Sequence, residues 1–181
     1  MFGLVAKWRR RPDPLTRLAQ HLDRLAERDE KTEEEVDRAE AARRQGARAL
    51  YQICAEFTQH LNSAMTRTEM QLVPTEYDAS TYRENAPNLI QMSLRGRIVQ
   101  IQYEATEQLV ATEDFRFPYI LQGAVNGFNQ TLLERDLIEE QLLFYAKSGR
   151  HDFRWHFFEP RTYRMGLVCE EYLTQLLARL A

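Results

Sequence analysis

The stretch that decides how this chain folds runs from residue 13 to residue 66 and reads DPLTRLAQHLDRLAERDEKTEEEVDRAEAARRQGARALYQICAEFTQHLNSAMT. Along it, steps of three and four residues connect one series of positions: 15, 18, 22, 25, 29, 32, 36, 39, 43, 46, 50, 53, 57, 60 and 64. Steps of this size place side chains in one seam of a helix. The seam is apolar at its two ends and polar or small in its centre. Each end can therefore pack an apolar stripe against another surface, whereas most of the centre cannot.

A helix is predicted to begin at Asp13 and Pro14, because aspartate suits the N-cap and proline suits the first helical position. Its first turns carry a compact leucine stripe, formed by Leu15, Leu18, Leu22 and Leu25. Residues 27–48 are almost wholly charged or alanine, which is typical of a solvated helical arm. Gly46 costs about 1 kcal/mol relative to alanine in a helix interior. The arm can therefore continue through Gly46, or two helices can meet there.

Residues 47–65 carry a broader apolar stripe, which includes Leu50, Ile53, Phe57 and Leu61. A stripe of this width favours packing on a globular body. The leucine stripe at residues 15–25 needs a different partner if the arm extends away from that body. Another copy of the chain or another protein would cover it, and folding back as a helical hairpin weighs about equally with self-association.

After Thr66 the periodicity changes to that of strands. Apolar alternation indicates strands near residues 70–72, 90–94, 99–103, 107–112, 115–125 and 151–158, while residues 129–147 are read as a helical turn followed by a strand. Asn126 and Gly127 look like a hairpin signal, and the turn-forming residues 74–88 predict a long surface loop. A wide apolar face over residues 162–180 predicts a final helix.

The predicted fold class is therefore α+β. An antiparallel sheet of about five strands is covered on one face by helix 47–65 and by a C-terminal helix over residues 162–180. The expected organisation is a flexible basic tail over residues 1–12, a charged helical arm over residues 13–46, and an α+β globular domain over residues 47–181.

Charge and cysteine content restrict the class of protein. The formal charge of −3 is uneven, with +4 over residues 1–12 and −6 over residues 67–145. An acidic central portion disfavours nucleic-acid binding, which usually requires a basic domain. The two cysteines, Cys54 and Cys169, lie far apart within apolar helical patterns, which favours buried free thiols and a cytoplasmic location.

The N-terminal segment permits a second interpretation. Residues 1–11 place Phe2, Leu4, Val5 and Trp8 before three arginines, so this segment could contact an anionic membrane surface. A frayed or locally docked tail is the favoured interpretation, because one short patch gives only marginal membrane affinity. The charges do not precede a long apolar run, so we do not read the segment as a secretory signal.

The sequence contains no recognisable cofactor or catalytic motif. Its seven glycines include no phosphate-binding spacing, and its histidines and cysteines include no zinc-ligand spacing. We therefore expect no cofactor and no metal, and the absence of a catalytic motif favours a protein that is not an enzyme. One cationic group could contact an anion or ligand, and it consists of Arg154, His156, Arg161 and Arg164. A solvated outer face of the sheet is the favoured interpretation of that group.

Two functional hypotheses are consistent with the sequence. The first is a non-catalytic interaction or scaffold protein that self-associates, or binds a partner protein, through Leu15, Leu18, Leu22 and Leu25. The alternative is a small-molecule binding or enzymatic domain with its site between the sheet and the helices. That site would be lined by aromatic residues and gated by loop 74–88, and the aromatic residues are Tyr103, Tyr119 and Trp155.

Overall fold

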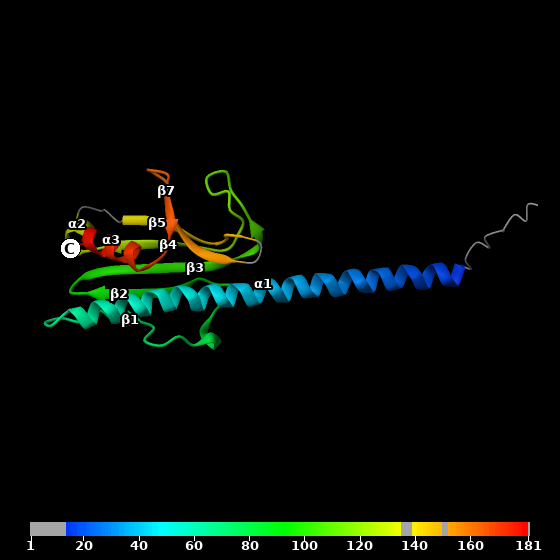
Figure 1. Ribbon diagram of the computed structural model, residues 1–181, viewed down its shortest axis with the longest axis horizontal. Helices are drawn as coiled ribbons and strands as arrows, with labels where there is room; N and C mark the ends of the chain where they lie inside the picture. The colour runs from blue at the N-terminus through cyan, green and yellow to red at the C-terminus, as the bar shows by residue number, and fades with distance from the viewer. Residues whose placement is uncertain (1–13, 135–138, 150–151, 181) are drawn as a thin grey trace, which may run out of the picture. The chain divides into compact units, whose positions relative to one another are not determined.

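The computed structural model describes residues 14–134, 139–149 and 152–180. It confirms the α+β class: a long N-terminal helix is followed by an antiparallel sheet and a C-terminal helix (Figure 1). The chain divides into two compact units, the first ending at Ala39 and the second beginning at Glu40. Tail residues 1–12 and the N-cap Asp13 lie outside the described residues.

Helix α1 runs without interruption over Pro14–Ala64, so the alternative of two helices meeting at Gly46 is wrong. The reason is that Gly46 is a packing position. A Cβ atom at Gly46 would lie 2.5 Å from Cδ1 of Tyr145 and 2.7 Å from Cδ1 of Leu121. The Gly46 carbonyl also accepts a hydrogen bond of 2.8 Å from Nε1 of Trp155. The glycine thus lets the helix backbone approach the sheet closely.

In the described residues the sheet has seven strands, not the five expected, in the order β1-β2-β3-β4-β5-β6-β7 with antiparallel neighbours throughout. The strands are β1 (Gln71–Val73), β2 (Asn88–Leu94), β3 (Arg97–Val110), β4 (Tyr119–Phe128), β5 (Glu139–Lys147), β6 (Phe153–Glu159) and β7 (Arg164–Leu167). Short helices occur at η1 (Ala79–Thr81) and α2 (Gln130–Glu134). Arg95 and Gly96, both with positive φ, form a two-residue turn between β2 and β3.

Two sequence predictions are corrected within this sheet. The C-terminal helix α3 spans Glu170–Leu180, and does not begin at residue 162, because residues 164–167 pair with β6 as strand β7. Asn126 and Gly127 form no hairpin but lie inside β4, where Gly127 faces Val99 and Glu139 on the neighbouring strands. A Cβ atom on Gly127 would lie 3.3 Å from Leu180, so this glycine gives α3 room to pack.

The main core lies between one face of the sheet and two helical segments, residues 47–58 of α1 and the helix α3. Leu50, Cys54 and Leu176 are fully buried there. Cys54 and Cys169 are free thiols, as expected, with Cys54 buried and Cys169 half-buried. Burial raises the pKa of the Cys54 thiol to about 12, so Cys54 is protonated and a poor nucleophile at neutral pH.

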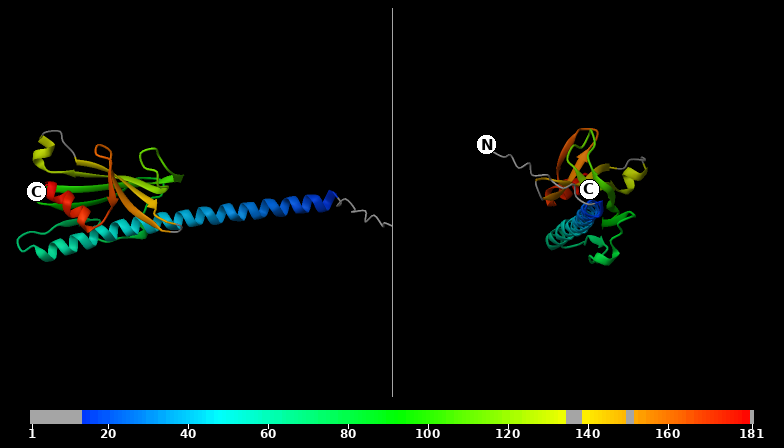
Figure 2. Two further views of the ribbon diagram at one scale, coloured as in Figure 1. Left: turned by 45° about the horizontal axis from the view of Figure 1, so that its top comes forward. Right: turned by 90° about the vertical axis from the view of Figure 1, so that its right-hand side faces the viewer.

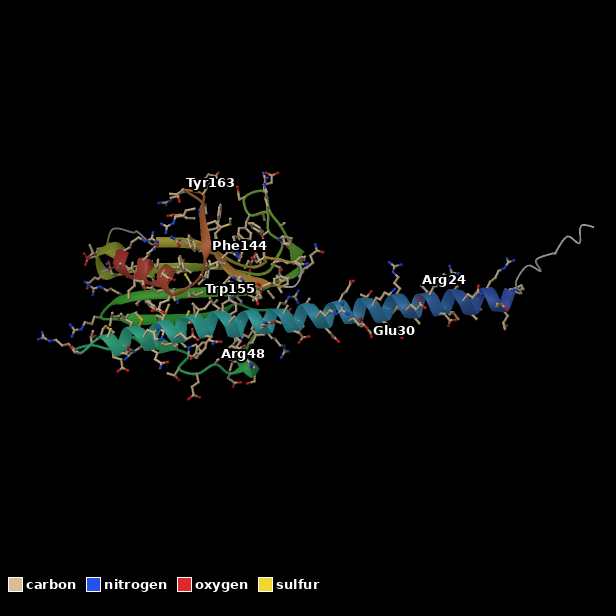
Figure 3. All side chains as sticks on the ribbon, viewed as in Figure 1. Arg24, Glu30, Arg48, Phe144, Trp155 and Tyr163 are labelled. Carbon is tan, nitrogen blue, oxygen red and sulfur yellow. The ribbon has the colours of Figure 1, made fainter. Side chains whose placement is uncertain are left out.

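The opposite face of the sheet carries a second, smaller cluster of buried residues, formed by Phe115, Tyr119, Phe144, Ala146 and Phe158. Loop 111–118 and the β6–β7 turn both rise from the sheet on this side, away from α1 (Figure 2). In Figure 3, Trp155 is labelled on the α1 side of the sheet and Phe144 on the other side. We call the surface around Phe144 the open face of the sheet.

Candidate functional site

The first candidate surface is an exposed apolar stripe on α1. It consists of four leucines, which we call the leucine seam: Leu15 (74% exposed), Leu18 (56%), Leu22 (54%) and Leu25 (41%). Seven-residue spacing relates Leu15 to Leu22 and Leu18 to Leu25, as in the a and d positions of a coiled coil. The four residues predicted to bind a partner are therefore exposed to solvent along one side of α1.

The residues that follow the leucine seam weaken its apolar character. Asp29 and Thr32 occupy the next two seam positions, and the exposed Val36 occupies the one after them. Here α1 is supported by ion pairs one helical turn apart, such as Arg38 with Glu34 at 2.8 Å. Because both partners are exposed, this pair adds little stability. The apolar part of the seam is therefore confined to about two heptads.

The second candidate surface is a pocket of about 610 Å³ on the open face of the sheet. The register places Gln102, Ala124 and Leu142 side by side on β3, β4 and β5. Ala124 has the smallest side chain of these three and leaves a hollow between its neighbours. Loop 111–118 and residues 158–160 complete the lining.

Aromatic rings form one wall of this pocket. Phe115, only 1% exposed, stacks on Phe144 with ring centroids 4.3 Å apart, and its ring also approaches Tyr119 at 6.0 Å and Phe158 at 6.5 Å. A tight turn holds Phe115 in place: Oγ1 of Thr112 accepts a hydrogen bond of 3.0 Å from the Phe115 amide, and the Thr112 amide donates to the Phe115 carbonyl at 3.0 Å. The wall is thus fixed by packing and by the loop backbone.

Polar side chains form the remainder of the lining. Three are exposed carboxylates, from Glu104, Asp114 and Glu140, and three are amides, from Gln102, Gln122 and Asn126. The Gln122 amide donates a hydrogen bond of 3.2 Å to the Glu104 carboxylate. The pocket therefore presents an acidic and amide rim beside an aromatic wall.

The four residues predicted for anion or ligand contact are not gathered in one place. Arg154 pairs with Asp152 at 2.9 Å and lies on the open face with His156, whereas Arg161 is exposed in the β6–β7 turn. Arg164 lies on the helix side, where it donates to Gln175 on α3 at 2.7 Å and lies 5.7 Å from the Phe157 ring centroid. The described contacts therefore divide these residues between two faces.

His156 belongs to the edge of the aromatic cluster. Its ring is parallel to that of Phe117 at 6.1 Å, and its Nδ1 donates a hydrogen bond of 3.0 Å to the Arg154 carbonyl. Burial lowers the pKa of His156, with a further lowering from the charge of Arg154. The hydrogen bond to the backbone acts in the opposite direction. His156 is therefore mostly neutral at pH 7.

Around Tyr103 and Trp155, the space between the sheet and the helices, where the alternative site was expected, is occupied by core side chains. A pocket of about 330 Å³ remains in that layer, lined by residues that include Leu61 of α1, Leu94 of β2 and Leu177 of α3. Tyr103 and Trp155 are buried in contact there, with ring centroids 5.7 Å apart, while Tyr119 lies on the open face. Loop 74–88, the expected gate, is held against α1 by a hydrogen bond and an ion pair. The Tyr51 hydroxyl donates to the Pro74 carbonyl at 3.1 Å, and Arg43 pairs with Glu84 at 2.6 Å.

Residues 14–134, 139–149 and 152–180 contain no group of three or more His, Cys, Asp or Glu side chains placed to hold a metal ion. They also contain no helix with the length and apolar content needed to cross a membrane. The predicted membrane contact through residues 1–11 lies outside the described residues.

The pocket could not be predicted from the sequence, because its three carboxylates, Glu104, Asp114 and Glu140, come from separate segments. Glu113–Asp114 and Glu139–Glu140 are adjacent pairs in the sequence, and since neighbours on a strand point to opposite faces, neither pair alone predicts a site with two carboxylates. The structure instead brings one member of each pair, Asp114 and Glu140, to the same pocket. Only the strand register, which places Glu140 beside Asn126, could have shown this. Comparison with protein-family models, with curated proteins and with solved structures gave no match to this chain.

Proposed function

We propose that this protein is a non-catalytic interaction protein that self-associates through a coiled coil built on the leucine seam. The observation that carries the proposal is the exposure of Leu15, Leu18, Leu22 and Leu25 at heptad spacing along one uninterrupted helix. Leucines in such a stripe are normally buried, since full burial of each is worth about 1.5–3 kcal/mol. A second copy of α1 would bury them.

The residues beside the seam suit a second copy. Ala19 and Ala26 directly follow Leu18 and Leu25, and these small residues allow a close approach of helices. Arg28 and Glu33 lie five residues apart at positions that face each other across a parallel pair of helices, and their charges are opposite. Asp29 and Thr32 interrupt the apolar stripe, so the contact is short and we expect association to be reversible.

A cytoplasmic location is part of the same proposal. The free thiols of Cys54 and Cys169 support it, because disulfides are rare in that compartment. The alternative function, a binding or catalytic site between the sheet and the helices, has less support. Trp155 in that space is buried and donates its hydrogen bond to Gly46.

The test is the oligomeric state of the full-length protein, measured by native mass spectrometry and by sedimentation velocity over a wide range of concentrations. We expect the wild type to form a dimer or larger assembly and the double variant Leu18→Glu/Leu22→Glu to be monomeric. Each position occurs in both chains of a dimer, so the two changes weaken association at least about a hundredfold. Thermal unfolding of the second unit should not change.

A matched control adds the same charge outside the leucine seam. The double variant Thr16→Glu/Gln20→Glu introduces two carboxylates at exposed positions on the outer surface of the same helix. It should associate like the wild type. A wild type that remains monomeric at every concentration would disprove the proposal, and so would equal dissociation of the two double variants.

A further inference from the structure

The pocket on the open face of the sheet is separate from the leucine seam, since all its lining residues lie between Gln102 and Pro160. Its volume of about 610 Å³ lies within the range of small-molecule sites, roughly 300–1,000 Å³. Its chemistry combines two features that would recognise different parts of one ligand. These are the carboxylates on the rim and the aromatic rings of the wall.

The negative charge of the lining favours a positively charged ligand. Glu104, Asp114 and Glu140 are exposed carboxylates from β3, loop 111–118 and β5. Among the described lining residues there is no Lys, Arg or His to offset them. The pocket therefore attracts cations and repels anions. The amides of Gln102, Gln122 and Asn126 can accept further hydrogen bonds from a cationic donor.

The aromatic wall selects the body of the ligand. Phe115 and Phe144 stack on each other, and Phe158 and Tyr119 also line the pocket. Phe115 and Phe144 are 1% and 7% exposed and cover each other's faces, so they offer a ligand only their edges. Together with the half-buried Leu142 and Ala124 they form an apolar lining that binds a flat apolar group by contact. A bare metal ion would leave this wall without a partner. A purely apolar ligand would gain no attraction from the carboxylates.

We infer that this pocket binds an organic ammonium ion carried on an aromatic body. The ammonium group pairs with the acidic rim that carries Glu104, Asp114 and Glu140, and the body lies against the apolar lining beside Phe115 and Phe144. This inference does not depend on self-association, because no residue of the leucine seam contributes to the pocket.

The test compares three indole probes on the full-length protein by isothermal titration calorimetry at low ionic strength. Tryptamine, tryptophol and indole-3-propionate share the ring and differ at the end of the side chain, which is cationic, neutral and anionic respectively. We expect saturable binding of tryptamine and about twofold to fivefold weaker binding of tryptophol. Indole-3-propionate should bind most weakly of the three.

Variants locate the binding. Glu104→Gln/Asp114→Asn/Glu140→Gln removes the three charges with little change of shape, and should weaken tryptamine binding about twofold to fivefold while leaving tryptophol binding unchanged. The control Glu56→Gln/Glu69→Gln/Glu76→Gln removes three exposed charges outside the pocket and should bind tryptamine like the wild type. A further variant, Ala124→Trp, fills the floor of the pocket and should abolish binding of both probes.

Several results would overturn the inference. They are the absence of saturable tryptamine binding, equal affinity for the three probes, and equal weakening by the pocket variant and its control. Circular dichroism of every variant checks that the fold is retained. Because the three pocket carboxylates are exposed, their neutralisation should leave the thermal unfolding temperature nearly unchanged.

Discussion

Packing against the sheet, and not helix propensity, explains why position 46 of α1 is a glycine. By propensity alone, Gly46→Ala would stabilise α1 by about 1 kcal/mol. The new methyl group would instead overlap the buried Tyr145 and Leu121 side chains and disturb the hydrogen bond from Trp155. Overpacking of this kind costs about 1–3 kcal/mol. We expect a net loss of about 1–2 kcal/mol in the free energy of unfolding, measured by urea denaturation.

The adjacent residue provides the control for that measurement. Gln45 is exposed on the same turn of α1, so Gln45→Ala should change the free energy of unfolding by no more than about 0.5 kcal/mol. If Gly46→Ala proved more stable than the wild type, the close approach of α1 to Tyr145 would not exist in solution.

His156 predicts a pH dependence of stability with a defined sign. Its pKa in the folded state is lowered from the ordinary value of 6.5, chiefly by burial, so protonation favours the unfolded chain. The stabilisation is present above pH 6.5 and is lost as the pH falls through the lower folded-state pKa. We expect His156→Phe, which keeps an aromatic ring beside Phe117, to reduce the loss of unfolding free energy between pH 7.5 and pH 5. Identical slopes for the two proteins would contradict this.

At the scale of elements, local patterns identified most of the fold. Residues 47–58 show a 3.6-residue period and residues 90–94 alternate, so α1 and β2 could be predicted from their own sequences. Strand β7 could not, because Met165 and Leu167 fit both a strand and the first turn of a longer helix. Pairing with His156 and Phe158 on β6 makes this segment a strand, and that pairing is a tertiary interaction.

The candidate sites differ in the same way. The leucine seam is a property of one helix, and heptad spacing was enough to identify Leu15, Leu18, Leu22 and Leu25. The pocket draws on β3, loop 111–118, β4, β5, and on Phe158 of β6 and Pro160 just after it. Its formation depends on strand register and on the turn at Thr112 that places Phe115 over Phe144. No pattern within a single segment contains that information.

At the scale of the whole molecule, one helix serves two compact units whose stabilities have different origins. Residues 47–58 of α1 are stabilised by burial of side chains such as Leu50 and Cys54. Residues 14–39 are stabilised by helix propensity and, in our proposal, by a second copy, while the exposed pair of Arg38 with Glu34 adds little. Most helical stability in proteins comes from packing of one face of the helix, so we expect residues 14–39 to open more easily than residues 47–58.

Hydrogen exchange measured by mass spectrometry should reveal this difference along α1. Amides of residues 47–58 should exchange only through global unfolding, whereas those of residues 14–39 should exchange through local opening. In Leu18→Glu/Leu22→Glu, protection should fall in residues 14–39 and stay unchanged in residues 47–58, because only the first segment depends on association. Thr16→Glu/Gln20→Glu should match the wild type in both segments. If the two segments lost protection together, α1 would unfold as one cooperative element, and the two units would not be independent in stability.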